Sequence, residues 1–383
     1  ESQTSMNSNL KFYLDKENQN LSTGIEVYEA LGSSPNDRYQ YTFPYYDFSK
    51  DLSSIISKNS IEGSIDFFST GKNTLSNTNN LRTTIVNDLN YNSPDFISNT
   101  GFKNNFNLYF KNLNSQGKND STYTSNTQID GMSILKIDTI LPLSKSNNNS
   151  EETLTPKISF RVNPGNNMDN YGTTSAVIDA NGAFDINRLG IANSFEAGKS
   201  LTFGLDYKFD QIEKDQTEDL SQEIKDKYLE FKLATVIRDD NEIDIPISST
   251  INRKNSNLFG SVNNKLLDNI DLTYNFSLDN DLKTIDSNSI ETKISINNFV
   301  TTFDFIEQRN EIGSTHLLSN ITEYQLNDKN YLKFSTRRNK EISLTEYYNL
   351  SYEYKNDCLT AALRFNKTFY KDNDLVPTED LFF

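Results

Sequence analysis

The chain has 383 residues, a formal net charge of −16, 35% hydrophobic residues and a single cysteine. The acidity argues against nucleic acid as a partner, since no basic stripe is present to neutralise phosphates. One cysteine excludes an internal disulfide and a cysteine-rich metal site, and without a run of about 18 apolar residues no membrane-spanning helix is expected.

The low hydrophobic content would fit a disordered chain, but the aromatic content does not. The chain holds 25 Phe and 20 Tyr, far too many for a solvated tail. A protein whose strands each have one apolar and one polar face can be fully folded and still have a polar average. The composition therefore favours a barrel with a polar lumen.

Alternation of apolar and polar residues, the period of a β-strand, recurs along the whole chain, whereas helical periodicity is nearly absent. The clearest strands are Leu201–Phe209, Ile270–Leu278 and Ile290–Ile296. Weaker strands are expected at 10–14, 25–28, 61–68, 81–89, 106–110, 134–141, 158–162, 229–237, 316–324 and 331–336. The last segment, Tyr347–Phe383, predicts two long strands and the start of a third.

Many of these segments reach about ten residues, the length that a tilted strand needs to cross a bilayer, whereas soluble strands average about five or six. Turns rich in Asn, Asp, Ser and Lys separate them, and the connections 163–189 and 210–227 are long. Asp215–Lys227 is the one stretch expected to form a helix. The pattern predicts an all-β protein, a large antiparallel transmembrane β-barrel of outer-membrane type with roughly 17 strands. Residues 1–383 are expected to form one domain.

Residues for catalysis or metal binding are sparse. His316 is the only histidine, so a Ser–His pair would have to use it with Ser314 or Ser319. The favoured alternative is a structural histidine beside Leu317. Asp372–Asp374 resembles the start of a calcium loop but lacks the glycine and the terminal glutamate of that motif. We therefore expect neither an enzyme nor a cofactor.

Two stretches are more specific. The first contains Thr153-Leu154-Thr155-Pro156, then Phe184-Asp185-Ile186-Asn187-Arg188, then Glu196-Ala197-Gly198 and Gly204-Leu205-Asp206-Tyr207. The second is Cys358, which opens the penultimate predicted strand. In this order they resemble the mid-barrel and C-terminal patterns of the LptD family, the lipopolysaccharide-assembly or organic-solvent-tolerance proteins. Tyr41–Lys50 resembles an early strand of that family, and the Asn-, Lys- and Ile-rich style resembles its alphaproteobacterial members.

The resemblance implies a protein of the Gram-negative outer membrane that inserts lipopolysaccharide into the outer leaflet through a barrel lumen and a lateral gate. It implies two protein partners, a plug lipoprotein called LptE and a periplasmic lipopolysaccharide-bridge protein that docks on an N-terminal β-jellyroll. Family barrels have about 26 strands. The chain is therefore expected to be a C-terminal barrel fragment without the jellyroll, the signal peptide, the first strands and the end of the last strand.

The matched stretches also supply candidate residues. Arg161, Asp185, Arg188 and Glu196 are expected to hold the long loop in the lumen through ion pairs, and the alternative is direct contact with substrate or partner. The resemblance implies that Cys358 lies at the periplasmic rim and forms a disulfide with a cysteine of the N-terminal region; composition alone would allow an inert buried cysteine.

Other functions stay open on the residues alone. A porin or substrate-specific outer-membrane channel of the same architecture is the main alternative. A soluble β-solenoid or adhesin would show a short fixed repeat, which the sequence lacks. A barrel enzyme is disfavoured because His316 stands alone.

Overall fold

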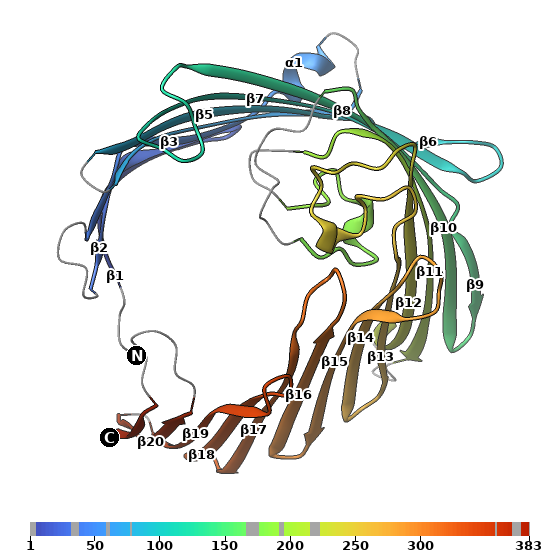
Figure 1. Ribbon diagram of the computed structural model, residues 1–383. Coiled ribbons are helices and arrows are strands. Elements are labelled where there is room, and N and C mark those ends of the chain that lie inside the picture. The colour runs from blue at the N-terminus through green and yellow to red at the C-terminus, as the bar shows by residue number, and fades with distance from the viewer. Residues whose placement is uncertain are drawn as a thin grey trace.

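The fold is a single antiparallel sheet that curls around a wide lumen (Figure 1). The computed structural model describes residues 5–31, 38–58, 62–76, 79–165, 176–190, 195–214, 223–356, 358–369 and 377–382. Its elements are β1(Ser5–Lys16), β2(Gln19–Ala30), β3(Tyr39–Asp51), α1(Ser53–Ser57), β4(Ser64–Ser76), β5(Asn80–Asn92), β6(Phe96–Ile97), β7(Lys103–Lys118), β8(Gln128–Ile140), β9(Leu143–Asn147), β10(Ser150–Asn163), η1(Gly182–Phe184), β11(Gly198–Lys214), β12(Glu223–Arg238), η2(Ile247–Ser249), β13(Leu258–Leu267), β14(Ile270–Leu278), β15(Ile285–Ile296), β16(Phe299–Gln308), β17(His316–Asn327), β18(Asn330–Asn339), β19(Leu344–Lys355), β20(Thr360–Thr368) and β21(Glu379–Phe382).

The strands form a meander in which each long strand pairs with its neighbours in sequence. The short strand β9 lies beside β10 in line with β8, and β6 pairs only with the start of β7. β1 and β21 are the two edges of the sheet, and within the described residues no ladder joins them. Figure 1 shows the two chain ends near each other across this opening.

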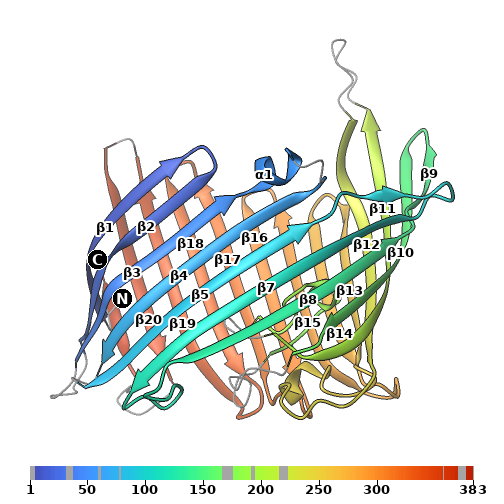
Figure 2. The same ribbon diagram turned by 90° about the horizontal axis from the view of Figure 1, so that it is seen from above.

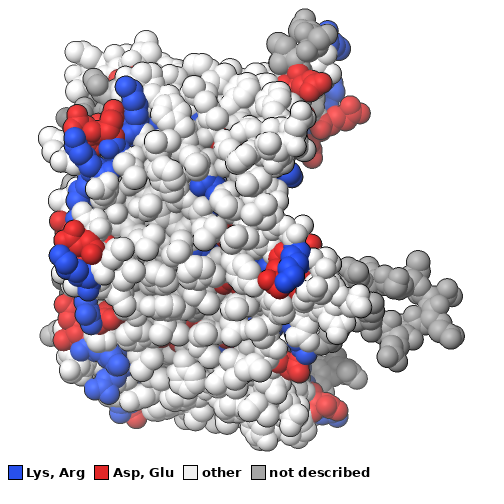
Figure 3. All heavy atoms as spheres, turned by 90° about the vertical axis from the view of Figure 1, so that its right-hand side faces the viewer, with Lys and Arg blue, Asp and Glu red and all other residues white. Residues whose placement is uncertain are grey.

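Side chains alternate between the lumen and the outside, as the sequence pattern predicts. On β11, Leu201 and Phe203 point outward and are 39% and 38% exposed, whereas Thr202 between them faces inward and is buried. Figure 3 shows the outer face of one side, where charged side chains gather mainly toward the margins around a broad uncharged field. An apolar band between charged margins is the outer surface of a barrel that sits in lipid.

The two ends of the sheet differ. At one end, two-residue turns join β1 to β2, β13 to β14, β15 to β16 and β17 to β18, and we call this end the short-turn rim. The opposite end, the long-loop rim, carries the connections 164–197 and 239–257. The β11–β12 hairpin extends beyond the other strands at the short-turn rim (Figure 2). In outer-membrane barrels the short turns face the periplasm.

Two expectations need correction. The sheet has 21 strands rather than roughly 17, partly because β13 and β16 lack a clean alternation: Gly260 interrupts one and Thr301-Thr302 the other. The helix expected at Asp215–Lys227 is wrong for 223–227, which belong to β12 and pair with β11; 215–222 lie outside the described residues. Asp372–Asp374 also lies outside them. None of the helices described here is long and apolar enough to cross a membrane.

Candidate functional site

The two long connections fold back into the lumen and pack on the inner face of β10–β13 (Figure 1). Together with that wall they build a small hydrophobic core, which we call the loop core. Its buried members are Ala176, Ile178, Ala180, Ala183 and Leu189 from the first loop, Ile245 and Ile251 from the second, and Ala234, Val236 and Phe259 from the wall. One sector of the inner wall is thus covered by a second layer.

The wall accepts this layer because its inward side chains are small or apolar. Ala234 and Val236 on β12 are 1% and 0% exposed. Gly204 on β11 faces Phe184 so closely that a Cβ atom there would lie 2.6 Å from the ring. Lys157 places its ammonium 4.6 Å from the centre of the same ring, which adds a cation–π contact. Larger polar side chains at these inward positions would keep the loop from packing against the wall.

Three arginines surround one carboxylate at the base of the loop core, and we call this group the arginine cluster. Arg161 donates from Nη1 to Glu196 Oε1 at 2.9 Å and to the Glu196 carbonyl oxygen at 3.1 Å. Arg188 also forms an ion pair with Glu196, and Arg238 Nη1 lies 3.4 Å from the same oxygen. All four side chains are at most 3% exposed. Removing one partner of such a buried network leaves uncompensated charge.

Arg188 ties the loop to the wall. Its guanidinium donates to Ser200 Oγ at 2.8 Å and to Thr202 Oγ1 at 3.2 Å, both on β11. Burial, together with the positive charges of Arg161 and Arg238, lowers the pKa of Arg188. The three guanidiniums therefore repel one another in a site shielded from water, and the carboxylate of Glu196 is what makes their proximity tolerable.

The spacing Glu196-Ala197-Gly198 has a structural reason. Gly198 has a φ of +86°, a conformation that favours glycine, and a Cβ atom there would lie 2.9 Å from Arg238 Nη2. The same point is 3.3 Å from Glu242 Oε1 and 3.8 Å from Asp239 Oδ1. Two further carboxylates of the second loop therefore lie close to the outer side of Arg238 and offset the formal excess of positive charge in the cluster.

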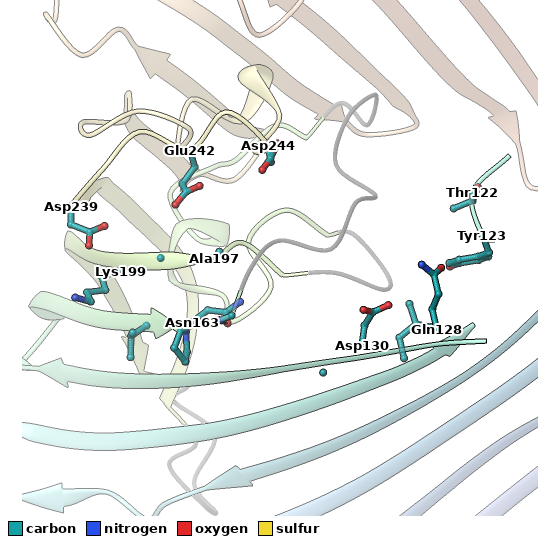
Figure 4. Close-up of a pocket in the computed structure, with 16 residues that line it drawn as sticks. Thr122, Tyr123, Gln128, Asp130, Asn163, Ala197, Lys199, Asp239, Glu242 and Asp244 are labelled. Carbon is teal, nitrogen blue, oxygen red and sulfur yellow. Dashed lines mark hydrogen bonds between the residues drawn. The ribbon is translucent and has the colours of Figure 1, made fainter. Parts of the chain in front are cut away.

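A pocket of about 900 Å³ opens beside this cluster at the long-loop rim. Figure 4 shows Asp239, Glu242 and Asp244 on one side of it and Asp130 on the other. Lys199 is the only basic residue among the described residues that line it. Such a pocket attracts cations and repels phosphates. Among the residues that the structure describes, no group of three or more His, Cys, Asp or Glu could hold a metal ion.

The loops also contact each other, and they reach along the inner face of the sheet as far as β7. The backbone N–H of Ala176 donates to Ser248 Oγ at 3.0 Å, and that hydroxyl donates back to the Ala176 carbonyl at 3.1 Å. Phe195 packs edge-on against Tyr109 of β7 with ring centres 4.9 Å apart. The two loops thus form one body that is fixed from β7 to β13.

The structure brings three of the four predicted loop residues together. Arg161, Arg188 and Glu196 share the arginine cluster, whereas Asp185 is exposed and lies outside it. Cys358 is exposed in the β19–β20 turn at the short-turn rim. Sequence reasoning missed Arg238; the signal was its place after Ala234 and Val236 on the inward-facing positions of a predicted strand.

A family model described as "LptD: LPS transport system D" matches residues 1–330. No curated relative matches the chain.

Similar solved structures include the copper transporter OprC (TM-score 0.35, 7% identity, 94% of this chain and 64% of that chain). A ferric enterobactin receptor mutant, PfeA from Pseudomonas aeruginosa, has TM-score 0.39 and 10% identity, with 95% and 65% coverage. The siderophore receptor PirA from Acinetobacter baumannii has TM-score 0.40 and 7% identity, with 95% and 65% coverage. The chain therefore spans 64–65% of the length of these three proteins, and TM-scores this low carry no argument about function.

Proposed function

Because the chain belongs to the LptD family of lipopolysaccharide transport proteins of the Gram-negative outer membrane, we propose that it passes lipopolysaccharide along its lumen and inserts it into the outer leaflet through a lateral gate. The observation that carries this proposal is the asymmetry of the lumen. The loop body covers the wall from β7 to β13, while the inner faces of β1–β4 and β15–β20, which are mainly polar, contribute no residue to the loop core. A saccharide needs such a hydrated polar path, and the acyl chains need the apolar outer face.

Two partners belong to the proposal. The plug lipoprotein LptE occupies part of the uncovered sector of the lumen and leaves the rest to the saccharide, and a periplasmic lipopolysaccharide-bridge protein delivers the substrate by docking on an N-terminal domain outside these 383 residues. The arginine cluster has a supporting role, because it fixes the loops on one wall and so keeps the opposite path open.

Neighbouring positions on β19 test the path. Asn349 faces the lumen and Leu350 faces outward, where it is 43% exposed. A photo-crosslinking residue at each position, in the full-length protein in cells, is followed by detection of lipopolysaccharide adducts. We expect energy-dependent adducts at Asn349 and far fewer at Leu350. Equal labelling at both positions, or none at Asn349, contradicts transport through the lumen.

The proposal also includes a disulfide between Cys358 and a cysteine outside these residues. Its support is the exposed position of the thiol in a turn at the short-turn rim, which is the periplasmic side in this class of barrel. Non-reducing electrophoresis of the full-length protein with and without Cys358→Ser provides the test. Identical migration, with a thiol reagent labelling Cys358 in the mature wild type, contradicts the disulfide.

The porin alternative makes a different prediction. A general channel would conduct ions steadily through the purified protein in a planar bilayer, without any need for lipopolysaccharide. The family match favours transport of lipopolysaccharide.

A further inference from the structure

A second polar cavity lies on the uncovered wall, across the lumen from the arginine cluster. It measures about 320 Å³ and is lined by inward-facing residues of β1, β2, β3 and β4. The register places these lining residues on one face of the four strands, with a β-bulge between Thr42 and Tyr45, and that face is the one turned to the lumen. Binding cavities start at about 300 Å³, a size that fits one sugar ring and excludes a lipid.

Tyr45 gives the first indication of a ligand. Its side chain is 5% exposed and lines the cavity, and its hydroxyl has no hydrogen-bond partner in the described part of the chain. A buried hydroxyl without a partner costs about 1–3 kcal/mol. Its neighbour Glu26 is already engaged, since Lys11 lies 2.9 Å from one oxygen and the Tyr28 hydroxyl donates to the other at 2.7 Å. The Tyr45 hydroxyl is therefore available to donate a hydrogen bond to a ligand in the cavity.

The second indication is Lys72. It follows from the register that Lys72 lies opposite Tyr45 on the adjacent strand, with both side chains on the lumen side. Within the described residues Lys72 forms no ion pair, and its side chain is exposed in the cavity. The cavity thus offers an ammonium group and a phenol hydroxyl as donors, with Asp47 and Gln40 as acceptors. This set matches a ring that carries several hydroxyls and one anionic group.

We propose that this cavity binds a single sugar unit carrying a phosphate or a carboxylate, with Lys72 paired to the anionic group and the Tyr45 hydroxyl donating to it or to a ring oxygen. The identification of that sugar as part of lipopolysaccharide rests on the proposed transport function. Binding itself does not, because it depends only on the purified protein. The cavity is then a binding site for the saccharide on the uncovered wall, along its path through the lumen.

The test measures binding to the full-length protein in detergent micelles, by saturation-transfer NMR and calorimetry. The probes are glucose 6-phosphate, glucose, inorganic phosphate and a deacylated lipopolysaccharide oligosaccharide. The variants are Tyr45→Phe and Lys72→Met. Lys293→Met is the matched control, because Lys293 is an exposed lumen lysine on β15. Each test variant removes a hydrogen bond to a charged group, so we expect about tenfold weaker binding of glucose 6-phosphate, and no change for the control.

The stability of the Tyr45→Phe variant shows whether the Tyr45 hydroxyl serves binding or the fold. Tyr45→Phe removes an unsatisfied hydroxyl, so the unfolding midpoint should stay the same or rise while binding falls. A fall in both would mean that the hydroxyl supports the fold, which overturns the proposal. Wild-type protein that binds no sugar phosphate, or that binds inorganic phosphate as tightly as the sugar phosphate, overturns it as well. Equal binding by all three variants does the same.

The oligosaccharide identifies the source of the sugar. Binding that weakens in Tyr45→Phe and Lys72→Met supports lipopolysaccharide as the ligand. Binding of glucose 6-phosphate alone overturns that assignment and leaves a site for free sugar phosphates. Failure of the crosslinking experiment at Asn349 would reject the transport path without touching this binding result, so the two proposals fail separately.

Discussion

The wall at β10–β13 and the wall at β16–β20 are built from the same alternating strands, yet only the first carries a second layer. On β12 the inward positions are Ala234, Val236 and Arg238, all at most 4% exposed. On β19 they are Asn349, Ser351 and Glu353, and no residue of that strand is buried. Outward residues are mainly apolar on both walls, as Leu233 on β12 and Leu350 on β19 illustrate. The comparison shows that the inward residues, not the overall hydropathy, decide which part of a lumen is filled.

Of the substitutions considered, Glu196→Gln should most strongly weaken the attachment of the loops to the covered wall and so make the two walls more alike. It leaves three buried guanidiniums without their shared carboxylate, and losing one partner of a buried ionic network costs about 3–5 kcal/mol. We expect hydrogen exchange at the amides of 176–190 to become more than about 100-fold faster, because about 1.4 kcal/mol corresponds to a factor of ten. Glu323→Gln is the control, since the Glu323–Lys333 pair is 53% exposed on both sides and contributes about 0–1 kcal/mol. Equal effects would remove any special role for the cluster.

Ile251→Ala and Ile321→Ala compare the same side-chain truncation on the two walls. Ile251 is 0% exposed in the loop core, whereas Ile321 faces the open lumen and is 43% exposed. We expect a loss of about 2–5 kcal/mol for the first substitution and less than about 1 kcal/mol for the second. Denaturant unfolding of the two variants in one detergent gives the comparison. Similar midpoints would mean that the loop core adds little to stability.

Arginine substitutions sharpen the distinction between the two faces of one wall. Leu350→Arg places a charge in lipid near the middle of β19 and should cost about 2–4 kcal/mol. Asn349→Arg points into water beside Ser335 and Asn366, so a much smaller cost is expected. Reversible folding into lipid vesicles gives both values. A similar cost on both faces would be inconsistent with a barrel in a membrane.

Gly198→Ala should have the smallest effect of the four, about 1–3 kcal/mol, because it combines a strained φ with a contact to Arg238. Gly190 has a φ of +65°, but a Cβ atom there would have no neighbour within 4 Å. Gly190→Ala therefore reports the backbone strain alone, about 1–2 kcal/mol. The difference between the two melting temperatures isolates the contact with the arginine. No difference would show that Arg238 moves aside freely.

Much of the fold could be predicted from the sequence because strand alternation is a local signal. Leu201–Phe209 shows it plainly, and β11 follows it. Strands β13 and β16 were missed where glycine and paired threonines obscure the period. The site was harder. The roles of Arg238 and Tyr45 depend on residues of other strands and loops that lie beside them in the fold. The sequence pattern does not show which distant residues will be brought next to them.

The arginine cluster also sets an order of assembly. Each strand pair of the meander joins residues that are close in sequence, so hairpins form early and quickly. The cluster instead joins Arg161 on β10 to Arg238 at the end of β12, and the loop core needs Phe259 on β13 as well. Until β13 has been added, the first loop lacks a complete surface to settle on. We therefore expect the filled sector of the lumen to be the last part of this region to become native, with the docking of the loops slower than the pairing of the strands.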